Sequence, residues 1–244
     1  MLTRLQLESN RLEGPIPSQI GQLSNLTQLF LAFNQFSGDV PPEIANLGAL
    51  TGGIGYNMLT ASSPDPAAYL DNTFPGWAAT QTVAPTNLAV GTVGPTRIQV
   101  TWDPIAYTGD GGYYRIHYGT TPGGPYPETA TAADKSASEY TVAGLLPDTP
   151  YYFIVESFTP AHVSQPNDLT SPPSAEISGT TDSPAAEGDA DNSGTVDLAD
   201  AILILQILAD IDTGTAEVTW SADASGDDRL GLEEAIFVLR LISR

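Results

Sequence analysis

The chain has 244 residues, of which 41% are hydrophobic and 15% charged, and this is the composition of a folded globular protein with one to three domains. Its formal net charge is −21, with 8 basic residues against 29 acidic ones, so a phosphate backbone or an anionic membrane surface would repel it. We therefore expect no nucleic-acid partner. Cysteine is absent, which excludes disulfides and thiolate metal sites.

The first part of the chain repeats itself with a period of 24 residues. Ten positions of the first copy recur in the second. They are Leu2, Leu5, Leu7, Asn10, Leu12, Gly14, Ile16, Pro17, Ile20 and Leu23, which return as Leu26, Leu29, Leu31, Asn34, Phe36, Gly38, Val40, Pro41, Ile44 and Leu47. A third, shortened copy runs from Leu50 through Ile54 and Asn57 to Leu59. The pattern ends there, and residues 60–83 are expected to form an irregular cap over the last copy.

This repeat resembles a leucine-rich repeat of the type with a Gly-x-Ile-Pro segment on its convex side. The resemblance implies an α/β solenoid fragment over residues 1–83, in which short strands carry the leucines inward and the asparagine bonds backbone groups at the following turn. At least about three coils are needed for stability, so two and a half copies beginning at Met1 suggest a truncated array. The strand faces that would contact a protein or glycan ligand carry Gln6, Glu8, Phe30 and Ala32.

From residue 84 the sequence changes to short alternating strands, separated by turn residues at the spacing of a β-sandwich. These strands are expected at residues 98–102, 114–118, 140–142 and 151–157. Trp102, together with the segment Leu146-Pro147-Asp148-Thr149-Pro150-Tyr151 that leads into a late strand, resembles a fibronectin type III domain over residues 84–181. This implies an all-β sandwich in which Tyr151 is a buried corner tyrosine whose hydroxyl bonds back to the chain. Residues 171–174, with two prolines, fit the break before a last edge strand.

A short polar linker, residues 182–187, precedes a stretch rich in aspartate. Residues 189–200 place carboxylate and hydroxyl oxygens at positions 1, 3, 5, 9 and 12 of a twelve-residue loop, with Gly194 at the sharp turn. A hard cation such as Ca²⁺ takes six to eight oxygen ligands, and this spacing allows one loop to wrap it. The layout returns 34 residues later, at 223–234. An apolar helix is expected after each loop, over residues 198–209 and 235–242.

This pair of loops resembles a dockerin, which is a tandem of calcium loops and helices that are each similar to half of an EF-hand. The resemblance implies a small all-α module over residues 188–244 with two bound Ca²⁺ ions. The ligands of the first ion would be Asp189, Asp191, Ser193, Thr195 through its main chain, Asp197 and Asp200. Those of the second would be Asp223, Ser225, Asp227, Arg229 through its main chain, and Glu234. The alternative is that both loops are ordinary solvated turns.

The second loop departs from the pattern at two positions. Asp228 stands where the loop requires glycine, and a non-glycine residue with positive φ is strained. Gly231 at position 9 offers no side-chain oxygen, so water would fill that place. We therefore expect the second calcium site to be weaker than the first.

Positions 10 and 11 of each loop carry partner recognition in dockerins, and this implies the partner-binding residues Leu198, Ala199, Leu232 and Glu233. The resemblances together predict a non-catalytic extracellular or cell-surface protein for adhesion or assembly. Its C-terminal module would dock on a cohesin-like partner, the sandwich would set the distance, and the repeats would bind the target. Two alternatives stay open: the calcium module is purely structural, or the chain is the non-catalytic tail of an enzyme whose catalytic domain lies upstream of Met1.

No residue pattern indicates catalysis. His117 alternates with Ile116 and Tyr118 in an expected strand, and His162 lies in a loop with no nucleophile or metal-ligand motif beside it in the sequence. No triad order, phosphate loop, zinc signature or nucleophile elbow occurs. The longest apolar run, residues 201–209, is too short to span a bilayer, and the expected secretion signal would lie upstream of this sequence.

Overall fold

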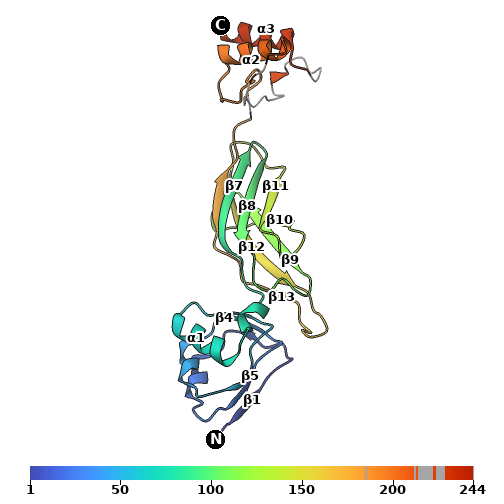
Figure 1. Ribbon diagram of the computed structural model, residues 1–244. Helices are drawn as coiled ribbons and strands as arrows, with labels where there is room; N and C mark the ends of the chain where they lie inside the picture. The colour runs from blue at the N-terminus through green and yellow to red at the C-terminus, as the bar shows by residue number, and fades with distance from the viewer. Residues whose placement is uncertain (185, 212, 214–221, 224–228, 244) are drawn as a thin grey trace. The chain divides into compact units, whose positions relative to one another are not determined.

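A computed structural model covers the whole chain and describes all residues except 185, 212, 214–221, 224–228 and 244 (Figure 1). The chain divides into two compact units. The first holds residues 1–93, 97–143 and 150–180, and therefore contains the repeats and most of the sandwich. The second holds residues 94–96, 144–149 and 181–244.

Short parallel strands form two sheets in the repeat region, residues 1–83. One sheet has the order β1 (Arg4–Gln6), β3 (Gln28–Phe30) and β5 (Thr51–Gly53), and the other has the order β2 (Glu13–Gly14), β4 (Gln35–Asp39) and β6 (Met58–Thr60). Leu5 is paired with Leu29, so the strand register has the period of the sequence repeat. Two 3₁₀ helices, η1 (Ser18–Gln22) and η2 (Pro42–Asn46), follow the extended residues Pro17 and Pro41. The buried core between these elements includes Leu29, Leu31, Ile44, Ile54 and Leu59.

Buried asparagines join each copy of the repeat to the one before it. The Asn34 amide donates to the Leu7 and Leu31 carbonyls, and its oxygen accepts from the Leu12 N–H at 3.1 Å. Asn57 makes the corresponding bonds one copy later, including one from the Phe36 N–H at 3.1 Å. These bonds satisfy main-chain groups of the turns, which explains why asparagine recurs in the sequence.

Residues 60–83 were expected to form an irregular cap, but the segment is not irregular. The segment contains the helix α1 (Pro64–Thr73) and the 3₁₀ helix η3 (Trp77–Thr80). Pro64 occupies the first helical position, where a main-chain N–H would have no acceptor within the helix, so proline loses no hydrogen bond there. Leu70 is buried. Gln81 then takes the asparagine position, since its oxygen accepts from Leu59 N–H and its amide donates to the Ile54 carbonyl. The repeat geometry therefore continues one copy beyond the recognisable sequence pattern.

Antiparallel strands build the sandwich in two sheets. The smaller sheet has the order β11 (Glu139–Ala143), β8 (Arg97–Asp103) and β7 (Thr86–Gly94). The larger has the order β10 (Glu128–Thr131), β9 (Tyr113–Gly119), β12 (Pro150–Thr159) and β13 (Leu169–Thr170), and β14 (Ile177–Thr180) also pairs with β12. Alternate residues of these strands face the core, which includes Ile98, Val100, Trp102, Tyr114, Ile116, Phe153 and Val155. Tyr151 is buried as expected.

Polar side chains of the sandwich contact the repeats within the first unit. The Gln165 amide donates to the Tyr56 carbonyl at 2.7 Å, and the Asn167 amide donates to the Asn10 carbonyl at 2.7 Å. Both side chains are buried, so these bonds replace water at main-chain groups that the repeat turns leave open.

The only lysine of the chain is buried in the sandwich. Lys135 has a relative exposure of 1%, and its ammonium donates to the Thr159 hydroxyl at 3.0 Å. The same nitrogen lies 3.9 Å from the centroid of the Tyr107 ring. Burial lowers the pKa of Lys135 to about 8, while the charge of Asp110 acts in the opposite direction.

The described part of the second unit contains the two apolar helices. They are α2 (Leu198–Leu208) and α3 (Leu232–Ile242), and their shared core includes Ala190, Ala201, Leu203, Ile204, Ala222, Ala235 and Val238. The expected start of the second helix at residue 235 is wrong by three residues, because Glu234 caps it: its carboxylate accepts from the Gly231 N–H at 2.8 Å. Among the residues that the structure describes, no helix has the length and apolarity to cross a bilayer.

Candidate metal site and paired helices

Three carboxylates of the first Asp-rich loop converge on one point. Asp189, Asp191 and Asp200 each offer an oxygen, and these oxygens all lie within 4.8 Å of one another. Calcium holds its oxygen ligands at roughly 2.3–2.6 Å, so two ligands on opposite sides of one ion are roughly 5 Å apart. The spacing of the three carboxylates therefore fits a single Ca²⁺ ion bound between them.

Main-chain N–H groups hold Asp189 in place. Its two carboxylate oxygens accept from the Ser193 N–H at 3.0 Å and from the Gly194 N–H at 2.9 Å. Gly194 has a φ of +84°, a conformation that glycine adopts without strain. The turn at position 6 of the loop is thus the feature that directs two N–H groups at the first carboxylate.

Asp200 closes the loop from its other end. One of its carboxylate oxygens accepts from the Ala190 and Asp191 N–H groups at 2.7 and 3.1 Å, and the other accepts from the Asp197 N–H at 2.8 Å. Asp200 lies in the first turn of α2, where the helix dipole favours negative charge. The helix therefore fixes the position of the last carboxylate of the loop.

Burial makes this group of carboxylates electrostatically costly without a cation. Asp189 and Asp200 have no solvent-exposed surface, and Asp191 is half-buried. Hydrogen bonds from Ser193 lower the pKa of Asp191, so this carboxyl group is ionised at neutral pH. Neighbouring carboxylates repel each other when charged, and a divalent cation would remove both the repulsion and part of the desolvation cost.

The other expected ligands of the first site lie in the same loop but make local bonds. The Ser193 hydroxyl donates to the Thr195 carbonyl at 3.2 Å, so these two oxygens are neighbours. The Asp197 carboxylate accepts from the Ala199 N–H at 2.7 Å and caps α2. The structure therefore groups three of the six expected ligands, and the other three stay predictions.

The second loop is described only in part. Ser225 and Asp227, two of the expected ligands, and Asp228 lie outside the described residues. Asp223 is half-buried, Arg229 is exposed and Glu234 is buried. The Glu234 carboxylate accepts from the Gly231 N–H in the same way that the Asp200 carboxylate accepts from the Asp197 N–H. Each residue of the second pair lies 34 residues before its counterpart in the first. The last carboxylate of each loop thus caps its helix in the same geometry.

Exposed apolar side chains follow both helices at corresponding positions. Leu198 and Leu232, two of the expected partner-binding residues, are 54% and 56% exposed. Ala199 and Glu233 are exposed as well. The exposed apolar residues continue along each helix and form what we call the paired stripes: Leu198, Ile202, Leu205 and Leu208 on α2, and Leu232, Ile236, Leu239 and Ile242 on α3. Each member of one stripe lies 34 residues from a member of the other.

The two histidines make hydrogen bonds within the first unit. His117 bonds the Thr129 hydroxyl at 3.0 Å and the Glu156 carboxylate at 3.2 Å across neighbouring strands. His162 bonds the Tyr107 hydroxyl at 3.1 Å. The companions of His162 come from distant parts of the sequence, which is why sequence reasoning missed them.

Comparison with known families assigns the first two parts of the chain. Residues 1–23 and 25–47 match the leucine rich repeat family, and residues 83–170 match the fibronectin type III domain family. The chain carries leucine-rich repeats followed by a fibronectin type III domain. The all-β sandwich expected from the sequence is confirmed. The dockerin resemblance of residues 188–244 stays a prediction.

Solved fibronectin type III structures resemble part of the chain at low identity. The chicken CNTN1 FN1-FN3 domains are 22% identical over 41% of this chain and 31% of that chain, with a TM-score of 0.33. The fn3 domain of human contactin 1 is 21% identical over 42% of this chain and 80% of that one, with a TM-score of 0.35. The FN5 domain of Drosophila Lar is 25% identical over 42% of this chain and 99% of that one, with a TM-score of 0.31. No curated protein matches the chain.

Proposed function

We propose that this chain is a non-catalytic adhesion or assembly protein of the cell surface or extracellular space, whose C-terminal module docks on a cohesin-like partner when calcium is bound. The paired stripes carry this proposal. They present apolar side chains at equivalent positions of two loop-helix units, and such a surface is favourable only when something covers it. The leucine-rich repeats form a solenoid fragment that binds the target, and the sandwich is the spacer.

In this proposal, bound calcium fixes the positions of α2 and α3 and so holds the docking surface in place. Asp200 and Glu234 are at once the last acids of their loops and the caps of α2 and α3. A cation held by Asp189, Asp191 and Asp200 would therefore fix where α2 begins, and with it the direction of its stripe. Two ions are proposed, and the second binds more weakly because its loop has fewer carboxylates.

A binding assay with cohesin domains tests the docking proposal. We would immobilise a panel of purified cohesin domains and measure binding of the full chain in calcium and in EGTA. Leu198→Asp combined with Leu232→Asp should abolish binding, since both residues are exposed, and aspartate is favourable in the first turn of a helix. Val163→Asp, which alters a fully exposed apolar residue of the sandwich, is the matched control.

The main alternative is a purely structural calcium module. It predicts that calcium binds and orders the C-terminal module, but that no cohesin domain is captured and the paired-stripe variant behaves as the parent does. An enzymatic role for a longer protein that contains this chain is a third proposal. Its test is the gene sequence upstream of Met1, in which a catalytic domain would be visible.

A further inference from the structure

The strand β5 leaves main-chain groups free at the end of the first repeat sheet. Thr51 N–H donates to the Thr27 carbonyl at 3.0 Å, and the Gly53 carbonyl accepts from Leu31 N–H at 2.8 Å, so both residues face β3. Gly52 lies between them with a φ of +136°, which glycine tolerates. Among the described residues, no hydrogen bond from its N–H or to its C=O is found outside the pairing of β5 with β3.

The chain itself prevents the next strand from pairing there. One repeat period after Thr51, Gly52 and Gly53 come Pro75, Gly76 and Trp77. Proline has no N–H to donate, and Gly76 has a φ of +78° at the start of η3, which is not an extended conformation. The backbone therefore turns into a 3₁₀ helix where each earlier copy placed a strand.

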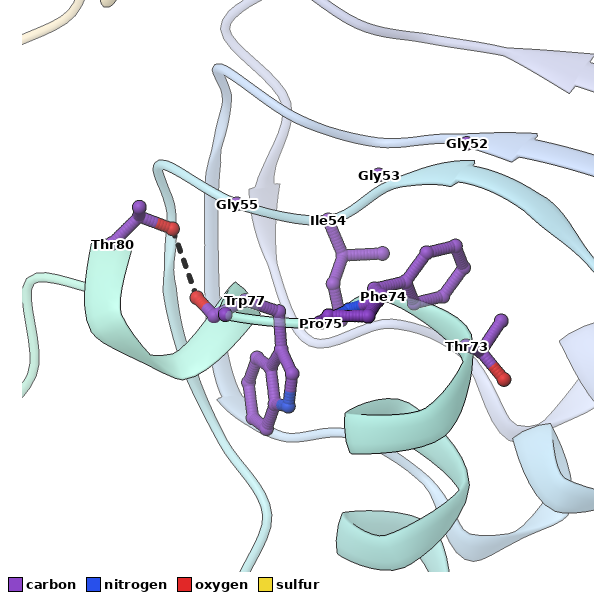
Figure 2. A pocket seen from close by; sticks show the side chains of 10 residues that line it. Gly52, Gly53, Ile54, Gly55, Thr73, Phe74, Pro75, Trp77 and Thr80 are labelled. Atoms are coloured by element: carbon purple, nitrogen blue, oxygen red, sulfur yellow. Dashed lines mark hydrogen bonds between the residues drawn. The ribbon is translucent and has the colours of Figure 1, made fainter.

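A groove occupies the place of the missing strand. Its volume is about 250 Å³, and Figure 2 shows it between the Gly52–Gly55 segment and the Thr73–Trp77 segment, with the side chains of Ile54, Phe74 and Trp77 beside it. Three of the four residues on the strand side are glycines. Gly53 lines the groove, and a Cβ added there would meet only the Ala32 Cβ, at 4.0 Å, so a larger side chain can be placed at this position without a clash at its Cβ.

We propose that this groove binds an extended peptide segment of a partner protein, which adds to β5 as a further strand. The partner's main chain would donate to the Gly52 carbonyl and accept from the Gly52 N–H, as in other cases of strand addition to an open sheet edge. A small side chain of the partner would lie over Gly53. Recognition would thus depend on the partner's main chain, which separates this site from side-chain docking on the strand faces and from the paired stripes.

A selected peptide tests the proposal. A phage library of random linear dodecapeptides would be panned on the immobilised full chain. The selected peptides would then be synthesised and their affinities measured by calorimetry. Gly53→Val should weaken binding at least tenfold, because it puts a branched side chain at the groove. Gly48→Val, at an exposed glycine with open space and no positive φ, should leave affinity unchanged. Circular dichroism melts would show that both variants stay folded.

Two further measurements decide the binding mode. N-methylation of single peptide bonds should abolish binding at alternate positions, and amide exchange should show protection at residues 51–56 in the complex. The proposal would be overturned if panning selects no phage that the free synthetic peptide can displace. It would also be overturned if Gly53→Val or N-methylation of the peptide leaves binding intact. A dimer in analytical ultracentrifugation that Gly53→Val dissociates would also overturn it, since a second copy would then occupy the edge.

Discussion

Replacing Lys135 by methionine should stabilise the sandwich near neutral pH and remove a pH dependence that the parent chain shows. Lys135 is 1% exposed, and burial lowers the pKa of its ammonium group from about 10.5 to about 8. The unfolded chain therefore keeps the Lys135 proton up to about pH 10.5, and the folded chain only up to about pH 8. Because the unfolded state binds more protons in this window, stability rises with pH between these two values.

The size of the effect follows from the same two pKa values. At pH 7 the cost of charging the buried amine is close to its full value, about 3 kcal/mol, since one pH unit corresponds to about 1.4 kcal/mol. At pH 9.5 the folded state holds the amine neutral, and only about 1.4 kcal/mol of the cost is left. The parent should therefore gain about 2 kcal/mol between pH 7 and 9.5. The methionine variant should gain nothing from this residue, and Thr159 would keep its bond to the Thr82 hydroxyl.

Lys135 is the only lysine, so selective labelling with ¹³Cε-lysine gives one assignable signal. Its chemical shift in the folded chain should titrate with a midpoint of about 8. Urea unfolding of parent and variant at pH 7 and 9.5 then gives the stability difference at each pH. The reasoning would be refuted by a midpoint near 10.5, or by a stability difference between parent and variant that is the same at both pH values.

Three further predictions concern single side chains. Asn57→Ala should cost at least about 3 kcal/mol of repeat stability in urea unfolding, because several buried main-chain groups lose their partner, whereas Asn10→Ala at the exposed equivalent position should cost less than about 1. Equal costs would contradict the role of the buried asparagines. Tyr151→Phe should cost about 1 kcal/mol by the same measurement if its hydroxyl bonds a main-chain acceptor, and an unchanged stability would show that it does not. Asp200→Asn should lower calcium affinity at least tenfold in titration calorimetry with little loss of helix by circular dichroism, and unaltered affinity would remove Asp200 from the ligand set.

The repeats were predictable because the same residue types recur at a fixed spacing. The continuation of the repeat beyond Leu59 was missed because Phe74 replaces the leucine and Gln81 replaces the asparagine of the pattern. Phe74 is nevertheless buried in the repeat core, and Gln81 bonds the preceding copy as the asparagines do. The strand β7 was missed because most of its residues are exposed, so it lacks the alternating pattern.

Contacts between distant residues could not be predicted from spacing at all. Asn167 bonds a carbonyl 157 residues away, and Gln165 bonds one 109 residues away. In the C-terminal module, by contrast, ligand spacing within one loop is local information. It predicts calcium ligands in this loop, and the carboxylates of three of them, Asp189, Asp191 and Asp200, lie close together. The exposure of the paired stripes, by contrast, depends on the packing of α2 against α3.

Amide hydrogen exchange of the full chain in calcium and in EGTA tests most directly whether calcium holds the C-terminal module together. A binding ion stabilises the folded form by about 2.7 kcal/mol when free calcium is a hundredfold above Kd, which is comparable with the whole stability of a module of this size. Peptides from α2 and α3 should therefore be protected in calcium and lose about a hundredfold of protection in EGTA, while peptides from β9 and β12 exchange equally in both. Asp189→Ala with Asp200→Ala should exchange in calcium as the parent does in EGTA. Equal protection of α2 and α3 with and without calcium would contradict the account, and the Asp-rich loops would then be ordinary turns.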